Sequence, residues 1–152
     1  SDAHHISAPH PEGDGAFTAM RDALADAGLR AEQVDYLNMH GTGTPHNDAM
    51  ESKAIDRLFG PAVPCSTTKS MTGHTLGASG ALELAFCWLL LTAQDDWRLP
   101  PSLYLDQRDP ELPSIALTGT NDCASEPPEF CMSNSFAFGG NNVSLVVSRT
   151  HA

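Results

Sequence analysis

The sequence predicts an α/β domain in which a mixed β-sheet carries helices on both faces and ends in a β-hairpin. Helix-like and strand-like segments alternate along most of the chain, and two strand-like segments joined by glycines and asparagines close it. Alternating helices and strands favour a parallel sheet with helices packed on it. The 152 residues show no internal repeat and no linker, so a single domain spanning residues 1–152 is expected.

Two helix–strand pairs open the chain. Apolar side chains recur at helical spacing in the predicted helices and alternate in the predicted strands. The helices are predicted over residues 13–27 and 48–59, and the strands over residues 34–39 and 63–67. Gly28 and Gly60 are placed to end the helices, and Asn47 is suited to cap the second one. Because helices connect the two strands, the strands are expected to be parallel neighbours.

Residues 81–93 form the most apolar segment of the sequence. A helix that is apolar on all sides is expected in the middle of a domain, with layers packed on more than one face. Glu83 interrupts the run, which is also too short to cross a bilayer. Residues 69–81 precede and enter it as a polar turn holding Lys69 and His74. These two side chains are expected at the mouth of a buried helix N-terminus, which favours negative charge.

The rest of the chain predicts an excursion over the surface and a hairpin. Residues 95–113 are rich in proline and acidic residues, which is typical of a surface segment. A short strand is predicted over residues 115–118. Two more are predicted over residues 130–135 and 143–148, and the intervening turn has two glycines and two asparagines for positive φ angles.

The composition excludes several classes of function. A formal charge of −11 argues against nucleic-acid binding and against adsorption to an anionic membrane. No basic, apolar leader opens the chain, so no export signal is expected. The cysteines have neither CxxC nor zinc-ligand spacing, and Cys65 and Cys87 are expected to be small buried hydrophobic residues. The expected location is therefore the reducing cytoplasm.

The histidines of the N-terminal segment do not predict a metal site. His4, His5 and His10 lie among prolines, and no acidic residue or cysteine stands at ligand spacing from them. A solvated loop is therefore predicted. A small metal-binding protein remains an alternative because the chain has seven histidines, and calorimetric titration with zinc tests it.

Three motifs lie at or close after predicted strands. His40 begins HGTGTP, Lys69 begins KSMTGHTLGASG, and residues 134–142 read NSFAFGGNN. Each motif alone also fits a glycine turn, a solvated lysine or a hairpin anchored by aromatic side chains. The carboxyl ends of parallel strands meet at one edge of an open sheet, where ligands bind. The first two motifs are therefore expected to converge.

Taken together, with Glu51 eleven residues after His40, the motifs resemble the C-terminal half of a β-ketoacyl-(acyl carrier protein) synthase. These are condensing enzymes with a thiolase-like fold. The resemblance covers nearly the whole chain and implies decarboxylative Claisen condensation of malonyl and acyl thioesters in fatty acid or polyketide synthesis. It implies no cofactor, since an acyl carrier protein presents the substrates on its phosphopantetheine. It also implies the N-terminal half of the synthase as a partner, in a homodimer or a ketosynthase heterodimer.

The resemblance assigns catalytic roles to matching residues. His40 and His74 would donate hydrogen bonds to the thioester carbonyl of a malonyl unit, because decarboxylation leaves an enolate oxygen that must be stabilised. Lys69 would add positive charge and orient the histidines. Glu51 matches a helix carboxylate that is expected to pair with Lys69.

Other matches concern the substrate. Thr42 and Thr44 match hydroxyls that contact the pantetheine arm. Phe138 matches the residue whose backbone N–H completes an oxyanion hole and whose ring gates the acyl pocket. The turn around it is also expected to bind substrate, through Phe136, Gly139 and Gly140.

The sequence departs from the family pattern in two ways. Ala137 stands where the family often has glycine, and its methyl group is expected to stiffen the gate. The family's cysteine nucleophile belongs to the N-terminal half, and no cysteine here lies in a strand-to-helix elbow. Cys131, the nearest to the gate, is expected in the core. The chain alone is therefore expected to be inactive in condensation.

A non-catalytic partner subunit of the chain-length-factor type is the alternative within the family. The retained His40, Lys69 and His74 argue against it, since buried polar and charged groups are costly to keep. The residue at the nucleophilic elbow upstream distinguishes the two: a cysteine there indicates an enzyme, and another residue indicates a partner.

Overall fold

The computed structural model describes residues 4–103 and 105–149. Among them, four strands form one sheet in the order β2-β1-β3-β4. β1 pairs in parallel with β2 and with β3, and β4 pairs antiparallel with β3. The strands are β1 (Tyr36–Asn38), β2 (Cys65–Ser66), β3 (Phe130–Ala137) and β4 (Asn141–Ser148). The predicted mixed sheet with a terminal hairpin is confirmed, as is the parallel pairing of the first two strands.

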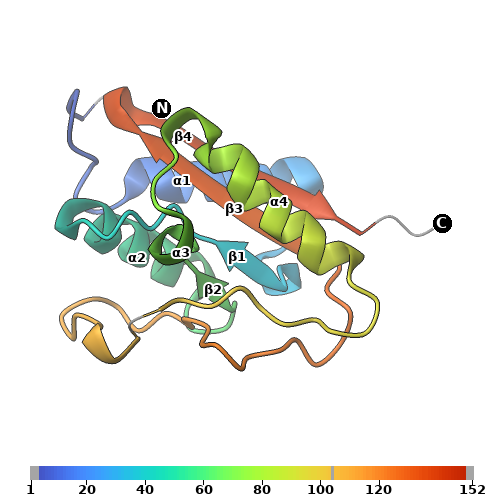
Figure 1. Ribbon diagram of the computed structural model, residues 1–152. Coiled ribbons are helices and arrows are strands. Elements are labelled where there is room, and N and C mark those ends of the chain that lie inside the picture. The colour runs from blue at the N-terminus through green and yellow to red at the C-terminus, as the bar shows by residue number, and fades with distance from the viewer. Residues whose placement is uncertain (1–3, 104, 150–152) are drawn as a thin grey trace.

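Helices cover both faces of the sheet, as predicted (Figure 1). Two of them pack on one face and on each other, and α4 lies across the opposite face against β3 and β1. The α-helices are α1 (Asp14–Ala27), α2 (Pro45–Phe59), the single turn α3 (Lys69–Thr72) and α4 (Ser79–Thr92). Short 3-10 segments occupy Ala31–Gln33, Leu76–Ala78, Leu105–Gln107 and Phe138–Gly140.

The start of α2 differs from the prediction. The helix begins at Pro45 with Thr44 before it, so Asn47 lies inside the first turn and the predicted cap at Asn47 is wrong. Proline is favoured at the first helical position because its missing N–H would have no partner there. The side chain of Asn47 donates instead to Asp48 and, at 3.4 Å, to Glu51.

Two segments near the sheet also differ. The stretch after β2 is the short helix α3, where the sequence predicted a polar turn. Residues 115–118 form no strand of their own, and a single parallel bridge joins Leu117 to Cys65. β3 extends to Ala137, so Phe136 lies in the strand and the turn is shorter than predicted.

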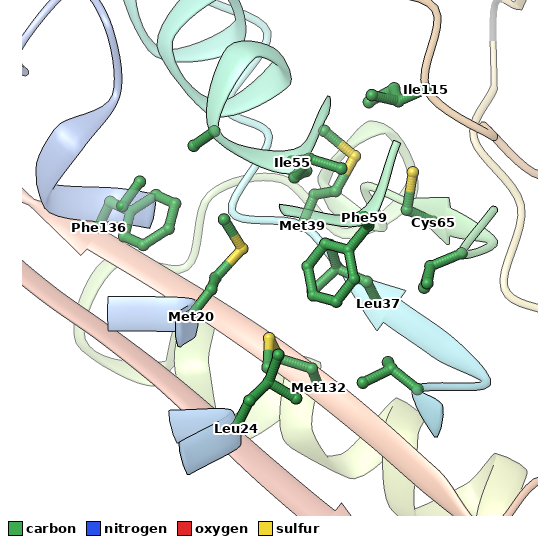
Figure 2. Packing of buried hydrophobic residues seen from close by; sticks show 14 of the residues in the cluster. Met20, Leu24, Leu37, Met39, Ile55, Phe59, Cys65, Ile115, Met132 and Phe136 are labelled. Atoms are coloured by element: carbon green, nitrogen blue, oxygen red, sulfur yellow. The ribbon is translucent and has the colours of Figure 1, made fainter. Parts of the chain in front are cut away.

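The main hydrophobic core lies between the sheet and helices α1 and α2 (Figure 2). Met20 of α1, Ile55 of α2, Leu37 of β1 and Met132 of β3 are fully buried in it. A second, smaller cluster lies between the sheet and α4, and consists of Tyr36, Cys87, Leu90, Leu91, Leu99 and Cys131. Cys65, Cys87 and Cys131 are buried as predicted, and all four cysteines are free thiols.

The outer face of α4 is bare in this chain, contrary to the prediction of burial on all sides. Trp88 is 61% exposed and Leu89 is 56% exposed. Val143 and Leu145 of β4 are 49% and 47% exposed. They lie on the same side of the sheet as α4, because they alternate along the strand with residues that face α1. Among the described residues, the sheet packs against the inner face of α4, and no second layer covers its outer face. None of the helices described here has both the length and the apolar character of a membrane span.

Candidate active site

His40 and Lys69 meet at the carboxyl ends of β1 and β2, as predicted. Nζ of Lys69 donates to the backbone carbonyl of His40 at 2.5 Å and lies 3.4 Å from Nδ1 of the His40 ring. The two residues are 6% and 7% exposed. The parallel pairing of two short strands therefore brings together side chains that are far apart in the sequence.

His74 joins them from the segment between α3 and α4. Its ring centroid lies 5.5 Å from that of His40, and the ring planes meet at 84°. His74 is exposed, whereas His40 is buried. The structure thus brings all three predicted groups, two imidazoles and one ammonium, to one edge of the sheet.

Hydrogen bonds fix the ring nitrogen that carries the proton in each imidazole. The Lys69 ammonium can only donate, so Nδ1 of His40 is an acceptor and the proton is on Nε2. The backbone N–H of Leu76 donates to Nδ1 of His74 at 3.3 Å, so His74 also has its proton on Nε2. Both rings are therefore Nε2–H donors.

His40 is held in the neutral form. Burial, followed by the positive charges of Lys69 and His74, lowers the pKa of His40 from 6.5 to about 3. A proton on both ring nitrogens would place a positive charge directly beside the Lys69 ammonium. At neutral pH the ring can therefore donate a hydrogen bond without acting as an acid.

The carboxylate partner of Lys69 is Glu83, and the predicted pairing with Glu51 is wrong. Glu83 lies on α4, and its Oε1 accepts from Nζ of Lys69 and from the hydroxyl of Ser79 at 3.0 Å. The Lys69 and Glu83 side chains are 5% and 2% exposed. A buried lysine requires such a partner. The sequence contained a signal for Glu83, because an acidic residue inside an apolar helix needs a cation nearby.

Glu51 instead holds the backbone of the HGTGTP turn. Its Oε1 accepts the N–H of His40 at 2.8 Å, and its Oε2 accepts the N–H of Gly41 at 2.7 Å. Burial raises the pKa of Glu51, and the Gly41 and His40 N–H groups partly offset this. Glu51 therefore lies at the site, with a role in shaping the turn that carries His40.

Gly41 is required by the close approach of this turn to the segment after β2. Its φ is +36°, and a Cβ there would lie 2.4 Å from Cβ of Thr67. The hydroxyl of Thr67 donates to the carbonyl of Gly41 at 2.6 Å. The two segments are therefore joined directly beside His40.

The predicted pantetheine contacts lie on an open turn. The hydroxyls of Thr42 and Thr44 are 2.8 Å apart and hydrogen-bonded to each other. Thr44 is exposed and Thr42 is half-buried. Both hydroxyls are thus on the surface side of the turn that His40 begins.

The predicted gate follows β3. The ring of Phe136 stands 5.9 Å from the ring of His40, at 64°. Phe138 is 77% exposed, and Gly139 and Gly140 have φ angles of +76° and +73°. Ala137 has an extended backbone (φ −134°, ψ 162°), so its methyl group causes no strain in this conformation. The stiffening effect of Ala137 on the gate remains a prediction.

The described histidines of the N-terminal segment are not grouped with other possible metal ligands. The rings of His4 and His10 stack edge-on at 4.9 Å. Within residues 4–103 and 105–149, no three His, Cys, Asp or Glu side chains are grouped so as to hold a metal ion. These residues give the metal-binding alternative no ligand set.

Curated relatives match almost the whole chain. The 3-oxoacyl-[acyl-carrier-protein] synthase 2 of Coxiella burnetii is 42% identical over 97% of this chain and 35% of its own length. The protein of the same name from Synechocystis sp. is also 42% identical, over 97% of this chain and 35% of its own. The chain therefore spans 35% of the length of these relatives.

Solved structures share the fold over 99% of the chain. One is a chain of the complex of ketosynthase ApeO with its chain length factor ApeC from Xenorhabdus doucetiae, with 48% identity, a TM-score of 0.91 and 37% of that chain covered. Another is a β-ketoacyl synthase from Burkholderia phymatum, with 38% identity, a TM-score of 0.89 and 36% of that chain covered. The predicted thiolase-like fold is confirmed.

The family described as "Beta-ketoacyl synthase, C-terminal domain" matches residues 1–105. That range contains His40, Lys69, His74 and Glu83. The chain therefore belongs to the β-ketoacyl synthase family and corresponds to the C-terminal part of its members.

Proposed function

We propose that this chain supplies the decarboxylation machinery of a 3-oxoacyl-(acyl carrier protein) synthase. One observation carries the proposal. The buried, neutral ring of His40 and the exposed ring of His74 meet edge-on, and each has its proton on Nε2. Nζ of Lys69 lies beside Nδ1 of His40. Two adjacent N–H donors of this kind match the need of an oxygen on which negative charge develops.

The chemistry begins with a malonyl thioester whose carbonyl oxygen accepts from the two Nε2–H groups. The bond between C2 and the carboxylate breaks, CO2 leaves, and the electron pair moves through C2 to give an enolate. The His40 and His74 donors stabilise the enolate oxygen more than the neutral carbonyl, which lowers the barrier. C2 then attacks an acyl thioester, a new C–C bond forms, and the thiolate leaves. The product is a 3-oxoacyl thioester.

The substrates arrive on a carrier protein in this proposal. The hydroxyls of Thr42 and Thr44 contact the phosphopantetheine arm, and the turn after Phe136 closes over the acyl group. Phe138 gates the pocket, with Gly139 and Gly140 providing the freedom of the turn. Because the thioester itself carries the reacting carbon, the chain requires no resident cofactor. We place the reaction in the cytoplasm, in fatty acid or polyketide synthesis.

The acyl acceptor comes from the rest of the synthase. Burial raises the pKa of Cys65 to about 12, and hydrogen bonding with Cys87, followed by burial, raises the pKa of Cys131 strongly, so these thiols are poor nucleophiles. The bare faces of α4 and β4, around Trp88 and Leu145, require an apolar partner. We assign both the nucleophilic cysteine and the cover for α4 to the upstream part of the protein. The chain alone is then inactive in condensation, and the complete protein forms a homodimer or a ketosynthase heterodimer.

The alternative is a chain-length-factor subunit that pairs with a ketosynthase. The similarity to chains from ketosynthase–chain length factor complexes favours considering it. A subunit without catalysis has no need for a buried Lys69–Glu83 pair directed at His40, since hydrophobic residues of similar volume cost less. The catalytic proposal therefore accounts for more of the site.

The test uses the full-length protein with malonyl and acyl carrier thioesters. The proposal expects formation of the 3-oxoacyl thioester, and loss of it when the upstream nucleophilic cysteine is replaced by alanine. The 152-residue chain alone is expected to form no such product. Absence of condensation by the full-length protein, together with a residue other than cysteine at the upstream elbow, supports the chain-length-factor alternative instead.

A further inference from the structure

Glu51 is a buried carboxylate that only neutral N–H groups hold in place. It is 0% exposed, and among the described residues no lysine, arginine or histidine forms an ion pair with it. Its two oxygens must point at the N–H groups of His40 and Gly41, which are 2.8 and 2.7 Å away. Besides these two backbone groups, two side-chain amides donate to the carboxylate, Asn47 to Oε2 at 3.4 Å and Asn134 to Oε1.

Asn134 of β3 makes the shorter of these two side-chain bonds. Its side-chain Nδ2 donates to Oε1 of Glu51 at 3.2 Å, and its Oδ1 accepts from the hydroxyl of Ser144 at 2.8 Å. Asn134 is 0% exposed. An ionised carboxylate only accepts, so the NH2 of the amide must face Glu51 and its oxygen must face Ser144. The Ser144 hydroxyl therefore favours the orientation of the amide that serves Glu51, and so does Sδ of Met20, which accepts from Nδ2 at 3.3 Å.

The same strand also touches the ring of His40. Phe136 lies two residues after Asn134 and so points to the same face of the sheet, where its ring stands 5.9 Å from the His40 ring. β3 is thus linked to His40 in two ways: Phe136 lies beside its ring, and Asn134 bonds Glu51, which accepts the His40 N–H. Because Asn134 and Ser144 are paired across β3 and β4, the hairpin as a whole is connected to His40.

We infer that Asn134 and Ser144 are positioning residues, which set the place of the His40 ring by orienting the Glu51 carboxylate. The inference rests on the proposed function, because it assigns the hydrogen-bond chain a purpose in decarboxylation. Neither residue needs to touch the substrate. The chain runs from the Ser144 hydroxyl through the Asn134 amide and the Glu51 carboxylate to the His40 backbone.

The physical consequence follows from the geometry required of a donor. When Ser144 loses its hydroxyl, Oδ1 of Asn134 loses its donor, and the amide can rotate away from Glu51 to find another one. Oε1 of Glu51 is then held less firmly, and so is the His40 N–H that donates to the same oxygen. A displacement of about 1 Å at a reacting group can lower a rate by about 100-fold, so a smaller shift of His40 produces a smaller but measurable loss.

The test is made on the full-length protein with Ser144→Ala, which removes a half-buried hydroxyl from the edge strand. Ser148→Ala is the matched control, because Ser148 is an exposed serine on the same strand. Ser144→Thr restores a hydroxyl and is the rescue variant. Two quantities are measured for each: kcat and KM for CO2 release from a malonyl carrier thioester, and the ring 15N resonances of His40.

We expect Ser144→Ala to lower kcat by about 5- to 10-fold with little change in KM, because the loss affects the transition state and not substrate binding. The His40 resonances shift in Ser144→Ala, and both values return toward wild type in Ser144→Thr. Ser148→Ala behaves as wild type. Equal kcat and unchanged His40 resonances in Ser144→Ala and Ser148→Ala overturn the inference. If the protein releases no CO2, the proposed function fails, and the His40 resonances still decide whether Ser144 positions the ring.

Discussion

The ring of His74 stands edge-on to the ring of His40, with 5.5 Å between their centroids. The first residue follows a helix and the second follows a strand, and only the fold brings them together. Nδ1 of His40 accepts from the Lys69 ammonium, and Nδ1 of His74 accepts from the Leu76 N–H. Each imidazole therefore has a defined tautomer.

The first prediction concerns the charge of His40. Its pKa of about 3 in the folded state lies below the ordinary 6.5, so the unfolded state binds more protons between these values. The contribution of His40 to stability is therefore complete above about pH 6.5 and is lost as the pH falls toward 3. In 15N NMR of the full-length protein, the His40 ring should stay neutral from about pH 5 to 8 with its proton on Nε2. A titration midpoint between about 6 and 7 would contradict the prediction, because it would mean that burial and Lys69 do not lower the pKa of His40.

The second prediction concerns the buried ion pair. Lys69→Met or Glu83→Gln leaves the partner group buried without compensation, so each should lower the free energy of unfolding by about 3–5 kcal/mol. The double variant should cost clearly less than the two losses added, because neither group is then left alone. Urea unfolding of the full-length protein measures all three. The cycle of Lys69→Met with Glu51→Gln is the control, and stronger coupling there than with Glu83 would contradict the assignment.

The third prediction compares two glycines of one turn. Gly41→Ala places a methyl group 2.4 Å from Cβ of Thr67, whereas Gly43→Ala meets no atom within 4 Å. Both glycines have positive φ angles, so both variants are destabilised by backbone strain and only the first is also destabilised by the clash. Gly41→Ala should therefore be less stable than Gly43→Ala by about 1–3 kcal/mol in denaturant unfolding. Equal losses would mean that Thr67 moves aside freely.

The fourth prediction concerns the bare face of α4. Trp88 is 61% exposed in this chain, and the upstream part of the protein is expected to cover it. With Trp97 and every upstream tryptophan replaced by phenylalanine, iodide should quench Trp88 fluorescence strongly in the 152-residue chain and weakly in the full-length protein. Quenching should differ because iodide reaches an exposed indole and does not reach a buried one. Equal quenching in both would show that another surface receives the upstream part.

Much of the fold follows from pattern and spacing. The alternation of helices and strands predicts the layers, and the position of His40 and Lys69 after neighbouring parallel strands predicts their meeting. Local rules were enough for the ends of the first helix, with Gly28 after Ala27. They were not enough at Asn47, because the helix begins earlier, at Pro45, whose fixed φ is already helical.

The errors at the site have a common cause. Glu51 and Glu83 both are acidic residues on helices near Lys69, and their sequence positions do not show which one the ammonium reaches. The direction of each side chain decides it, because Glu51 points from α2 to the HGTGTP turn and Glu83 points from α4 to Lys69. The apolar composition of α4 likewise predicts burial on all sides, but the residues described here bury only its inner face. Asn134 opens the NSFAFGGNN motif, but neither it nor Ser144 was given a role, because polar residues in strands are ordinary until their pairing is seen.

The central claim is that two Nε2–H donors stabilise one developing oxyanion. It is tested by the rate of CO2 release from a malonyl carrier thioester, measured for the full-length protein and for His40→Ala, His74→Ala and His10→Ala. Removing a donor of this kind costs about 100- to 1,000-fold in rate, so the first two variants should fall by that much while the His10 variant keeps the wild-type rate. A full rate in His40→Ala or His74→Ala would contradict the claim.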